Sequence, residues 1–268
     1  MNLELEAAWI SGLIDGPVLK IPREGAIGAD LSGRIPPRHP CRYNPCASRS
    51  EPAELGERLS MQNDRKEVKM YSDFKSPYAF LAFDPAFALE DKYQIKLKWK
   101  PFQLRLKGKG ERSQYSEFKV KYSYMDARRW ANMRGGLMIR GPLKIFDTTP
   151  ALIGGLYAEK YGKIREYGNK VFELFFKREL AADEPDAVAR AMGNIEGLSA
   201  QGYREYLASD GPAEYERAQN EAVIDQVFGV PMFYFEQEPF WGYDRLGLLE
   251  HRLTEAGLKR EQQLKQAV

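Results

Sequence analysis

A serine hydroxyl at the predicted start of a helix is the first feature that could do chemistry. Ser76-Pro77-Tyr78-Ala79 directly follows a predicted strand. Serine is favoured at a helix N-cap and proline at the first helical position. Unpaired N–H groups and the helix dipole favour negative charge at this end, so a thiolate there is stabilised. We therefore expect Ser76 to donate a hydrogen bond to a thiolate that a ligand supplies. A plain helix cap is the alternative interpretation.

The elements that would position Ser76 follow from the pattern of apolar residues. Residues 68–74 alternate and predict a strand, and the apolar run 78–89 predicts a helix. Strict alternation over 95–100 predicts a second, half-buried strand. A strand, a helix and a strand in direct succession form a βαβ unit, so we expect the two strands to be parallel.

The remainder of the chain divides into a helical part and a short C-terminal part. Residues 113–226 show helical spacing with glycine and proline breaks, which predicts four to six helices. Residues 230–235 predict a strand, 236–239 a turn and 240–241 a short second strand. Leucines at helical spacing before Gly257 predict a final helix.

The order of these elements predicts an α/β fold. A βαβ unit, a helical block and a ββα unit correspond to a thioredoxin-like sheet split by a large all-helical insertion. We expect 66–110 and 227–258 to form the thioredoxin-like domain and 111–226 to form the insertion. Residues 1–62 include a stretch dense in Pro, Gly, Arg and Ser, which predicts a disordered N-terminal extension.

Cysteine usage excludes dithiol chemistry at the helix start. Redox proteins of the thioredoxin fold carry CxxC there, whereas this chain carries Ser76-Pro77-Tyr78-Ala79. The two cysteines, Cys41 and Cys46, lie far upstream and could act only if they folded onto the site. The two histidines, His39 and His251, form no cluster, so we expect no metal site.

Composition also argues against several classes of partner. The chain carries 40 basic and 38 acidic residues, for a net charge of +2, which does not indicate nucleic-acid binding. No apolar run is long enough to span a bilayer, and the first six residues do not resemble a signal peptide. We therefore expect a cytoplasmic protein with a small-molecule substrate and neither a nucleic-acid nor a membrane partner.

A proline at the entry to the third strand supplies a counterpart to Ser76. Val230-Pro231 lies at the entry to a predicted strand, where the proline cannot supply the N–H that a sheet ladder needs. In a thioredoxin-like fold this proline is usually cis. The cis bond would turn the Val230 backbone toward the first helix, where it could pair with an extended, peptide-like ligand. An ordinary proline at a strand edge is the alternative.

Five segments together carry a family resemblance. They resemble motifs of the 2-hydroxychromene-2-carboxylate isomerases and the related kappa-class glutathione transferases, in the same order and over about residues 66–256. The segments are Asp73–Ala82, Trp99–Phe102, Asp126–Ala131, Phe228–Pro231 and Phe240–Leu246.

The resemblance implies that reduced glutathione is the thiol. Ser76 would hydrogen-bond its sulfur, and the backbone at Val230 and Pro231 would hold its cysteinyl part. Asp244 and the Tyr243 backbone would bind the γ-glutamyl end, where a carboxylate suits an ammonium group. The family also implies a homodimer.

The resemblance further implies an isomerase or transferase acting on a small conjugated or aromatic carboxylate, such as 2-hydroxychromene-2-carboxylate. The thiolate would add to a conjugated double bond, allow rotation, and leave again. Lys107 and Lys109 are the candidates for binding the substrate carboxylate, although segment 104–112 lacks the asparagine of the isomerases. The alternatives are a non-catalytic glutathione- or peptide-binding protein and a DsbA-like disulfide oxidoreductase.

Overall fold

The computed structural model describes residues 65–104, 114–144 and 146–260. These residues all belong to the unit Glu51–Val268. The predicted extension with its two cysteines, and the candidate substrate residues Lys107 and Lys109, lie outside the described residues.

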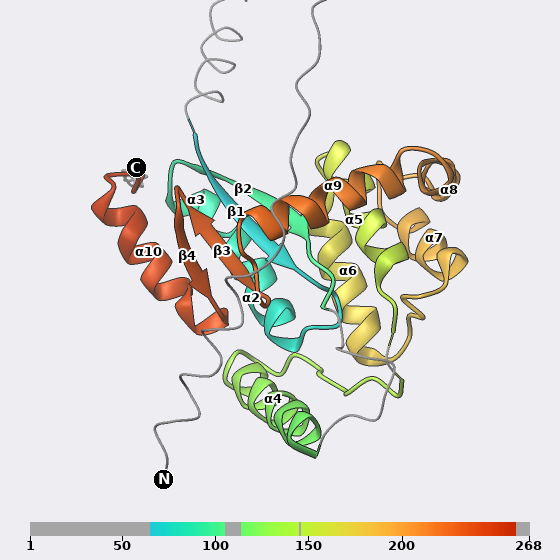
Figure 1. The fold of residues 1–268 in the computed structure, drawn as a ribbon, viewed down its shortest axis with the longest axis horizontal. Coiled ribbons are helices and arrows are strands. Elements are labelled where there is room, and N and C mark those ends of the chain that lie inside the picture. Colours follow the sequence, from blue (N-terminus) through green and yellow to red (C-terminus); the bar gives the residue numbers. More distant parts are fainter. Residues whose placement is uncertain (1–64, 105–113, 145, 261–268) are drawn as a thin grey trace, which may run out of the picture. The chain divides into compact units, whose positions relative to one another are not determined.

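The described strands form one mixed sheet in the order β2-β1-β3-β4 (Figure 1). β1 (Lys66–Ser72) pairs in parallel with β2 (Ile95–Pro101), as the βαβ pattern predicted. β3 (Met232–Phe235) runs antiparallel to β1 and to β4 (Glu238–Trp241). The predicted α/β, thioredoxin-like fold is confirmed, and its two halves meet where β1 pairs with β3.

The first and third strands differ at their ends from the prediction. β1 ends at Ser72 rather than at residue 74, because the chain turns at Asp73, whose carboxylate accepts the Lys75 N–H. β3 begins at Met232 rather than at residue 230, because Pro231 has no N–H to donate to the ladder.

The hairpin turn is also shorter than predicted. The turn was expected over residues 236–239, but β4 already begins at Glu238, which pairs with Phe235. Glu236 adopts a left-handed conformation with a φ of 57°, and this lets the chain reverse within two residues.

Helices cover both faces of the sheet (Figure 1). α2 (Pro77–Phe87), the short α3 (Leu89–Lys92) and α10 (Leu246–Glu255) pack with the apolar strand residues of one face. α9 (Gly211–Ile224) covers the other face, where its Ala222 packs near Tyr71 and Met232.

Six helices lie between β2 and β3 in the described part of the chain, within the predicted range of four to six. Besides α9 they are α4 (Gln114–Met133), α5 (Thr149–Lys160), α6 (Ile164–Lys177), α7 (Pro185–Gly193) and α8 (Ala200–Ala208). Among the described helices, none combines the length and apolar character needed to cross a bilayer.

An aromatic cluster joins α6 to α2. The fully buried Phe172 ring lies 4.9 Å from Phe74 and 5.3 Å from Phe83, between ring centroids. Gly168 permits this approach, because a Cβ there would lie 2.0 Å from the Phe83 ring. The insertion therefore packs directly against the turn that precedes Ser76.

A charged network holds α9 on the sheet. Lys69 Nζ lies 2.9 Å from Glu221 and 2.7 Å from Asp225, and Lys100 Nζ lies 2.8 Å from Glu221. The Tyr71 hydroxyl donates to Asp225 at 2.6 Å. Burial alone would raise the pKa of Asp225, but hydrogen bonds from Lys69 and Tyr71 lower it below its ordinary value.

This lowered pKa predicts how Asp225 contributes to stability. An ionised carboxylate with a lowered folded pKa stabilises the fold above its unfolded pKa of about 3.9, and the effect is lost as pH falls through the folded pKa. Asp225→Asn should therefore be less stable than the parent protein at pH 7, and the difference should shrink below about pH 4. Urea unfolding of both proteins at several pH values measures this difference in the free energy of unfolding.

Asp186→Asn is the matched control, because that side chain is 74% exposed and its ion pair with Arg204 lies on the surface. A stability difference for Asp225→Asn that stays constant down to pH 3 would contradict the assigned role of the carboxylate.

Candidate functional site

Ser76 caps α2 as the sequence predicted. Its backbone is extended, with φ −90° and ψ 117°, and Pro77 occupies the first turn of the helix. The Ser76 hydroxyl oxygen accepts the Ala79 N–H at 3.2 Å. The hydroxyl therefore stands at the positive end of the helix dipole, where an anion is favoured.

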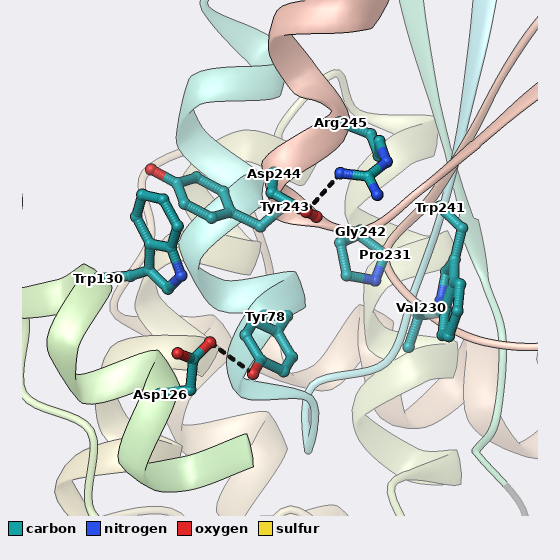
Figure 2. A pocket seen from close by; sticks show the side chains of 10 residues that line it. All are labelled: Tyr78, Asp126, Trp130, Val230, Pro231, Trp241, Gly242, Tyr243, Asp244 and Arg245. Atoms are coloured by element: carbon teal, nitrogen blue, oxygen red, sulfur yellow. Dashed lines mark hydrogen bonds and ion pairs between the residues drawn. The ribbon is translucent and has the colours of Figure 1, made fainter. Parts of the chain in front are cut away.

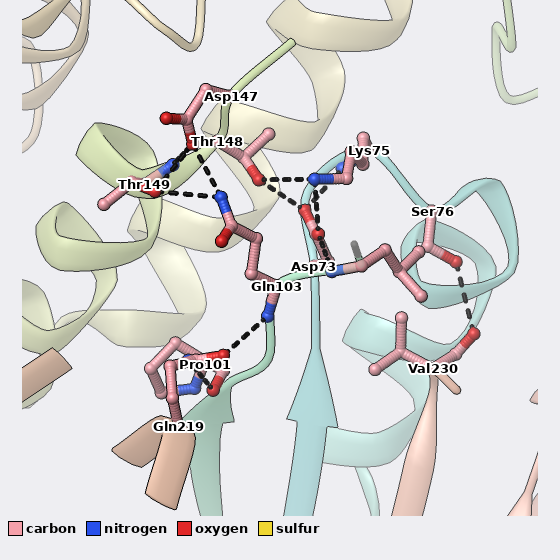
Figure 3. A network of polar contacts seen from close by, with 11 residues as sticks. Asp73, Lys75, Ser76, Pro101, Gln103, Asp147, Thr148, Thr149, Gln219 and Val230 are labelled. Carbon is pink, nitrogen blue, oxygen red and sulfur yellow. Dashed lines mark hydrogen bonds and ion pairs between the residues drawn. The ribbon is translucent and has the colours of Figure 1, made fainter. Parts of the chain in front are cut away.

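The same hydroxyl faces the proline loop of the second half of the chain (Figure 3). Ser76 Oγ donates to the Val230 carbonyl at 3.3 Å, and the Val230–Pro231 peptide bond is cis, as predicted. The Ser76 side chain is only 4% exposed. The structure thus brings Ser76, Val230 and Pro231 together.

A buried carboxylate holds the turn before Ser76 (Figure 3). Asp73 is fully buried, and its oxygens accept the Lys75 N–H at 3.1 Å, the Thr148 hydroxyl at 2.7 Å and the Leu104 N–H at 2.7 Å. Lys75 Nζ lies 3.0 Å from the same carboxylate. Asp73 therefore ties the turn to the segment before α5 and to the segment after β2.

A second set of polar contacts extends this support. The Gln103 N–H donates to Gln219 on α9 at 3.1 Å, and the Gln103 side chain donates to Asp147 at 2.6 Å and to Thr149 at 2.9 Å (Figure 3). Burial alone would raise the pKa of Asp147, but hydrogen bonds from Thr149 lower it. The segment after β2 is thereby connected to two helices of the insertion.

A cavity of about 440 Å³ opens beside the proline loop (Figure 2). Its walls come from the start of α2, from α4 and from the segment between β4 and α10. The lining residues are Tyr78, Asp126, Trp130, Val230, Pro231, Trp241, Gly242, Tyr243, Asp244 and Arg245. Four predicted ligand-binding residues therefore share one cavity. Ser76 is not on its wall but contacts it through the Val230 carbonyl.

Aromatic rings form much of this wall. Trp130 of α4 meets Tyr243 edge-on, with ring centroids 5.4 Å apart. The Arg134 guanidinium lies 5.5 Å from the centre of the Tyr243 ring. On the other side, Trp241 meets Phe228 edge-on at 4.8 Å. Flat apolar walls of this kind suit a planar ligand.

Two carboxylates face the cavity in different states of pairing. Asp126 accepts a hydrogen bond from the Tyr78 hydroxyl at 2.9 Å, whereas Asp244 pairs with its neighbour Arg245 at 2.5 Å (Figure 2). Burial and the bond to Asp126 raise the pKa of Tyr78 above its ordinary value, so the phenol stays protonated.

Asp244 lies in a short 3₁₀ turn, Tyr243–Arg245. α10 begins directly after this turn, at Leu246. Gly242, with a φ of 117°, makes this turn possible, because a Cβ there would lie 2.5 Å from Asp244. Its N–H donates to the Pro231 carbonyl at 2.9 Å, which holds the turn against the proline loop.

The sequence did not assign roles to six lining residues: Tyr78, Asp126, Trp130, Trp241, Gly242 and Arg245. All six lie inside the segments that carried the family resemblance, but nothing in their spacing shows that α4 turns toward α2. Tyr122 and Tyr124, on the same helix as Asp126 and Trp130, do not line this cavity. No group of three potential metal ligands occurs among the described residues.

Comparison with known proteins agrees with this architecture. Residues 67–254 match the family model of the DSBA-like thioredoxin domain. The 2-hydroxychromene-2-carboxylate isomerase of Pseudomonas putida is 27% identical over 189 residues, covering 68% of this chain and 92% of that protein. The isomerase of Sphingobium xenophagum is 24% identical over 196 residues, covering 71% and 99%. The chain is thus a distant homologue of these isomerases.

Solved structures resemble the chain in fold. A 2-hydroxychromene-2-carboxylate isomerase superposes with a TM-score of 0.62 at 24% identity, over 71% of this chain and 96% of that one. A probable DsbA oxidoreductase from Streptomyces coelicolor superposes with a TM-score of 0.60 at 19% identity, over 76% and 95%. At these identities the structures support the thioredoxin-like fold alone.

The buried carboxylate gives a prediction about stability. Asp73→Ala would leave the Lys75 ammonium without its counter-ion and the Leu104 N–H without its acceptor, and removing one partner of a buried ion pair costs about 3–5 kcal/mol. We expect a loss of this size in the free energy of unfolding, measured by urea denaturation. Asp84→Ala, at a 54% exposed carboxylate of α2, should cost no more than about 1 kcal/mol. Equal losses in the two variants would contradict the role of Asp73.

Proposed function

We propose that this chain, which belongs to the DSBA-like thioredoxin domain family, is a glutathione-dependent isomerase or transferase. Its substrate would be a small conjugated or aromatic carboxylate resembling 2-hydroxychromene-2-carboxylate, and a bound thiol would act as the nucleophile. The homodimer and the cytoplasmic location suggested by the sequence are part of this proposal.

The observation that carries the proposal is the position of the Ser76 hydroxyl. It stands at the start of α2, 3.3 Å from the Val230 carbonyl, where dithiol proteins of this fold carry a cysteine. Serine cannot form a disulfide, and no cysteine occurs at positions 76–79. A thiolate at this point would therefore arrive with a ligand, and the helix end and the hydroxyl would both stabilise it.

The surrounding groups support glutathione as that ligand. An extended tripeptide could pair with the backbone at Val230, as peptides pair with exposed strand edges. Asp244 lines the same cavity and could accept the γ-glutamyl ammonium group, with the Tyr243 backbone beside it. Arg245 now pairs with Asp244, so the ammonium would have to displace its guanidinium.

The reaction follows from the chemistry of a thiolate and a conjugated carbonyl. The sulfur forms a bond to the β-carbon, and the double-bond electrons move to the carbonyl oxygen. The former double bond is now single and rotates. When the oxygen electrons return, the C–S bond breaks, the alkene re-forms in the other geometry and the thiolate is released. Ser76 would stabilise the sulfur as nucleophile and as leaving group.

A non-catalytic thiol-binding protein is the second candidate. It is favoured by the burial of the Ser76 hydroxyl, which already donates to Val230 and accepts from Ala79. The bond to Val230 is long at 3.3 Å, and a thiolate is a stronger acceptor because it is charged. We therefore expect the hydroxyl to turn toward the sulfur when the thiol binds. Calorimetry with glutathione and an absorbance assay with the hydroxychromene carboxylate separate the two candidates.

Replacing the hydroxyl tests the proposed nucleophile site. Ser76→Ala should lower turnover by about 10- to 100-fold, because a hydrogen bond to a charged group contributes about 1.5–3 kcal/mol. The affinity for glutathione should change much less. Turnover measured by absorbance and affinity measured by calorimetry give the two quantities.

Ser123→Ala is the matched control, because the Ser123 hydroxyl is exposed and donates to the Lys119 carbonyl. Ser76→Ala also removes a helix cap, which costs about 1 kcal/mol of stability, so both variants are compared below their unfolding temperatures. Unchanged turnover in Ser76→Ala would remove the role assigned to this residue.

Replacing the second carboxylate tests the thiol-binding end. Asp244→Ala should weaken glutathione binding by about tenfold while leaving turnover at saturating thiol near that of the parent, because its partner is remote from the sulfur. Titration calorimetry measures the affinity, and Asp84→Ala serves as the control. An unaltered affinity would contradict the assigned contact.

A further inference from the structure

The Tyr78–Asp126 hydrogen bond is a feature of the cavity that the proposed thiol chemistry does not use. Tyr78 comes from the first turn of α2 and Asp126 from the middle of α4, and their side chains meet at 2.9 Å on the cavity wall (Figure 2). The bond joins the thioredoxin-like part to the insertion beside Ser76.

The direction of this bond determines what the pair can offer a ligand. A phenol has one proton, and the Tyr78 hydroxyl donates it to Asp126. Burial and Asp126 raise the pKa of Tyr78, so the phenol is not ionised near neutral pH. The pair therefore presents acceptor lone pairs to the cavity and no donor.

Asp126 is the stronger of these acceptors. Tyr78 occupies its Oδ2 atom, and among the described cations the nearest to Oδ1 is the Arg129 guanidinium, at 4.0 Å. Arg129 is 61% exposed, so water screens its charge, whereas the Asp126 side chain is 22% exposed. Within the described part of the chain, the carboxylate thus has an acceptor oxygen without a close donor, and its surroundings screen it less than those of an exposed side chain.

The aromatic side chains near Asp126 favour a planar ligand. Trp130, one turn further along α4, Tyr78 and Tyr243 place aromatic rings on the same wall. The cavity of about 440 Å³ is large enough for a two-ring compound. An aromatic body would lie against these rings, with its edge toward the carboxylate.

We propose that Asp126, positioned by Tyr78, accepts a hydrogen bond from a hydroxyl group on the aromatic ligand that enters this cavity. The inference rests on the proposed function, since the ligand is the second substrate of the same site, and it narrows the substrate class to aromatic compounds with a phenolic hydroxyl. Asp126 binds the ligand, and Tyr78 is the positioning residue.

The charges of the wall also orient the ligand. Asp126 and Asp244 are the two carboxylates of the described lining, and its cation, Arg245, is already paired with Asp244. An anionic group next to Asp126 would be repelled. A hydroxy-aromatic carboxylate therefore binds with its hydroxyl toward Asp126 and its carboxylate directed away from it.

Binding of a matched pair of probes tests the inference without any reaction. Calorimetry of the full chain without glutathione compares 6-hydroxy-2-naphthoate with 6-methoxy-2-naphthoate, which lacks the donor. We expect the hydroxyl compound to bind about tenfold more tightly, because its acceptor is charged. Asp126→Asn should remove this advantage while leaving the affinity for the methoxy compound unchanged, which shows that the cavity is intact.

Two further variants locate the acceptor. Tyr78→Phe retains the Asp126 charge and should keep the preference for the hydroxyl compound. Asp84→Asn is the control, because it changes an exposed carboxylate of α2 outside the cavity, and it should also keep the preference. Loss of the preference in Tyr78→Phe but not in Asp126→Asn would assign the contact to the phenol and overturn the inference. If Asp126→Asn binds neither probe, Asp126→Glu is measured instead. A preference of Asp126→Glu for the hydroxyl compound supports the carboxylate as the acceptor, and no preference overturns the inference.

Other outcomes overturn the inference outright. They are equal affinities of the parent protein for the two naphthoates, binding of neither, or a preference that survives in Asp126→Asn. A protein that binds glutathione without preferring the hydroxyl loses only this inference. A protein that prefers the hydroxyl but binds no glutathione loses the proposed function instead.

Discussion

The hydrogen bond from the Ser76 hydroxyl to the Val230 carbonyl joins two parts of the chain that are 154 residues apart in sequence. It can form only because β1 and β3 are neighbours in the sheet, which brings the start of α2 next to the cis-proline loop. The positive end of the helix and the backbone of the proline loop therefore lie next to each other. The proposed thiol chemistry depends on that contact.

Buried polar groups stabilise this arrangement. The Asp73 carboxylate is removed from water but keeps hydrogen bonds from three segments and an ion pair with Lys75. A buried charge is tolerated when its neighbours replace the lost hydration. On the other face, Lys69, Glu221 and Asp225 hold α9, the helix that leads to the proline loop. Both halves of the site are thus supported from outside the cavity.

The helical insertion does more than lengthen the chain between two strands. α6 packs its aromatic residues against α2, and α4 supplies Asp126 and Trp130 to the cavity. In the proposed function, the thioredoxin-like sheet would provide the thiol end of the site, and the insertion would provide the wall that a second ligand contacts. Substrate choice could then change with α4 while the proposed thiol chemistry at Ser76 stayed the same, as fold and function are separable in general.

The sequence by itself determined the element types, the helix start at Ser76 and the absence of a dithiol there, because hydrophobic period, capping and cysteine content are local properties. It also indicated the proline loop and the thioredoxin-like order of elements. It did not show that Tyr78 and Asp126 meet, that Asp244 lies in a 3₁₀ turn paired with Arg245, or where β1 ends and β3 begins. These features depend on how distant segments pack and on which groups compete for one carboxylate, and only the tertiary structure decides that.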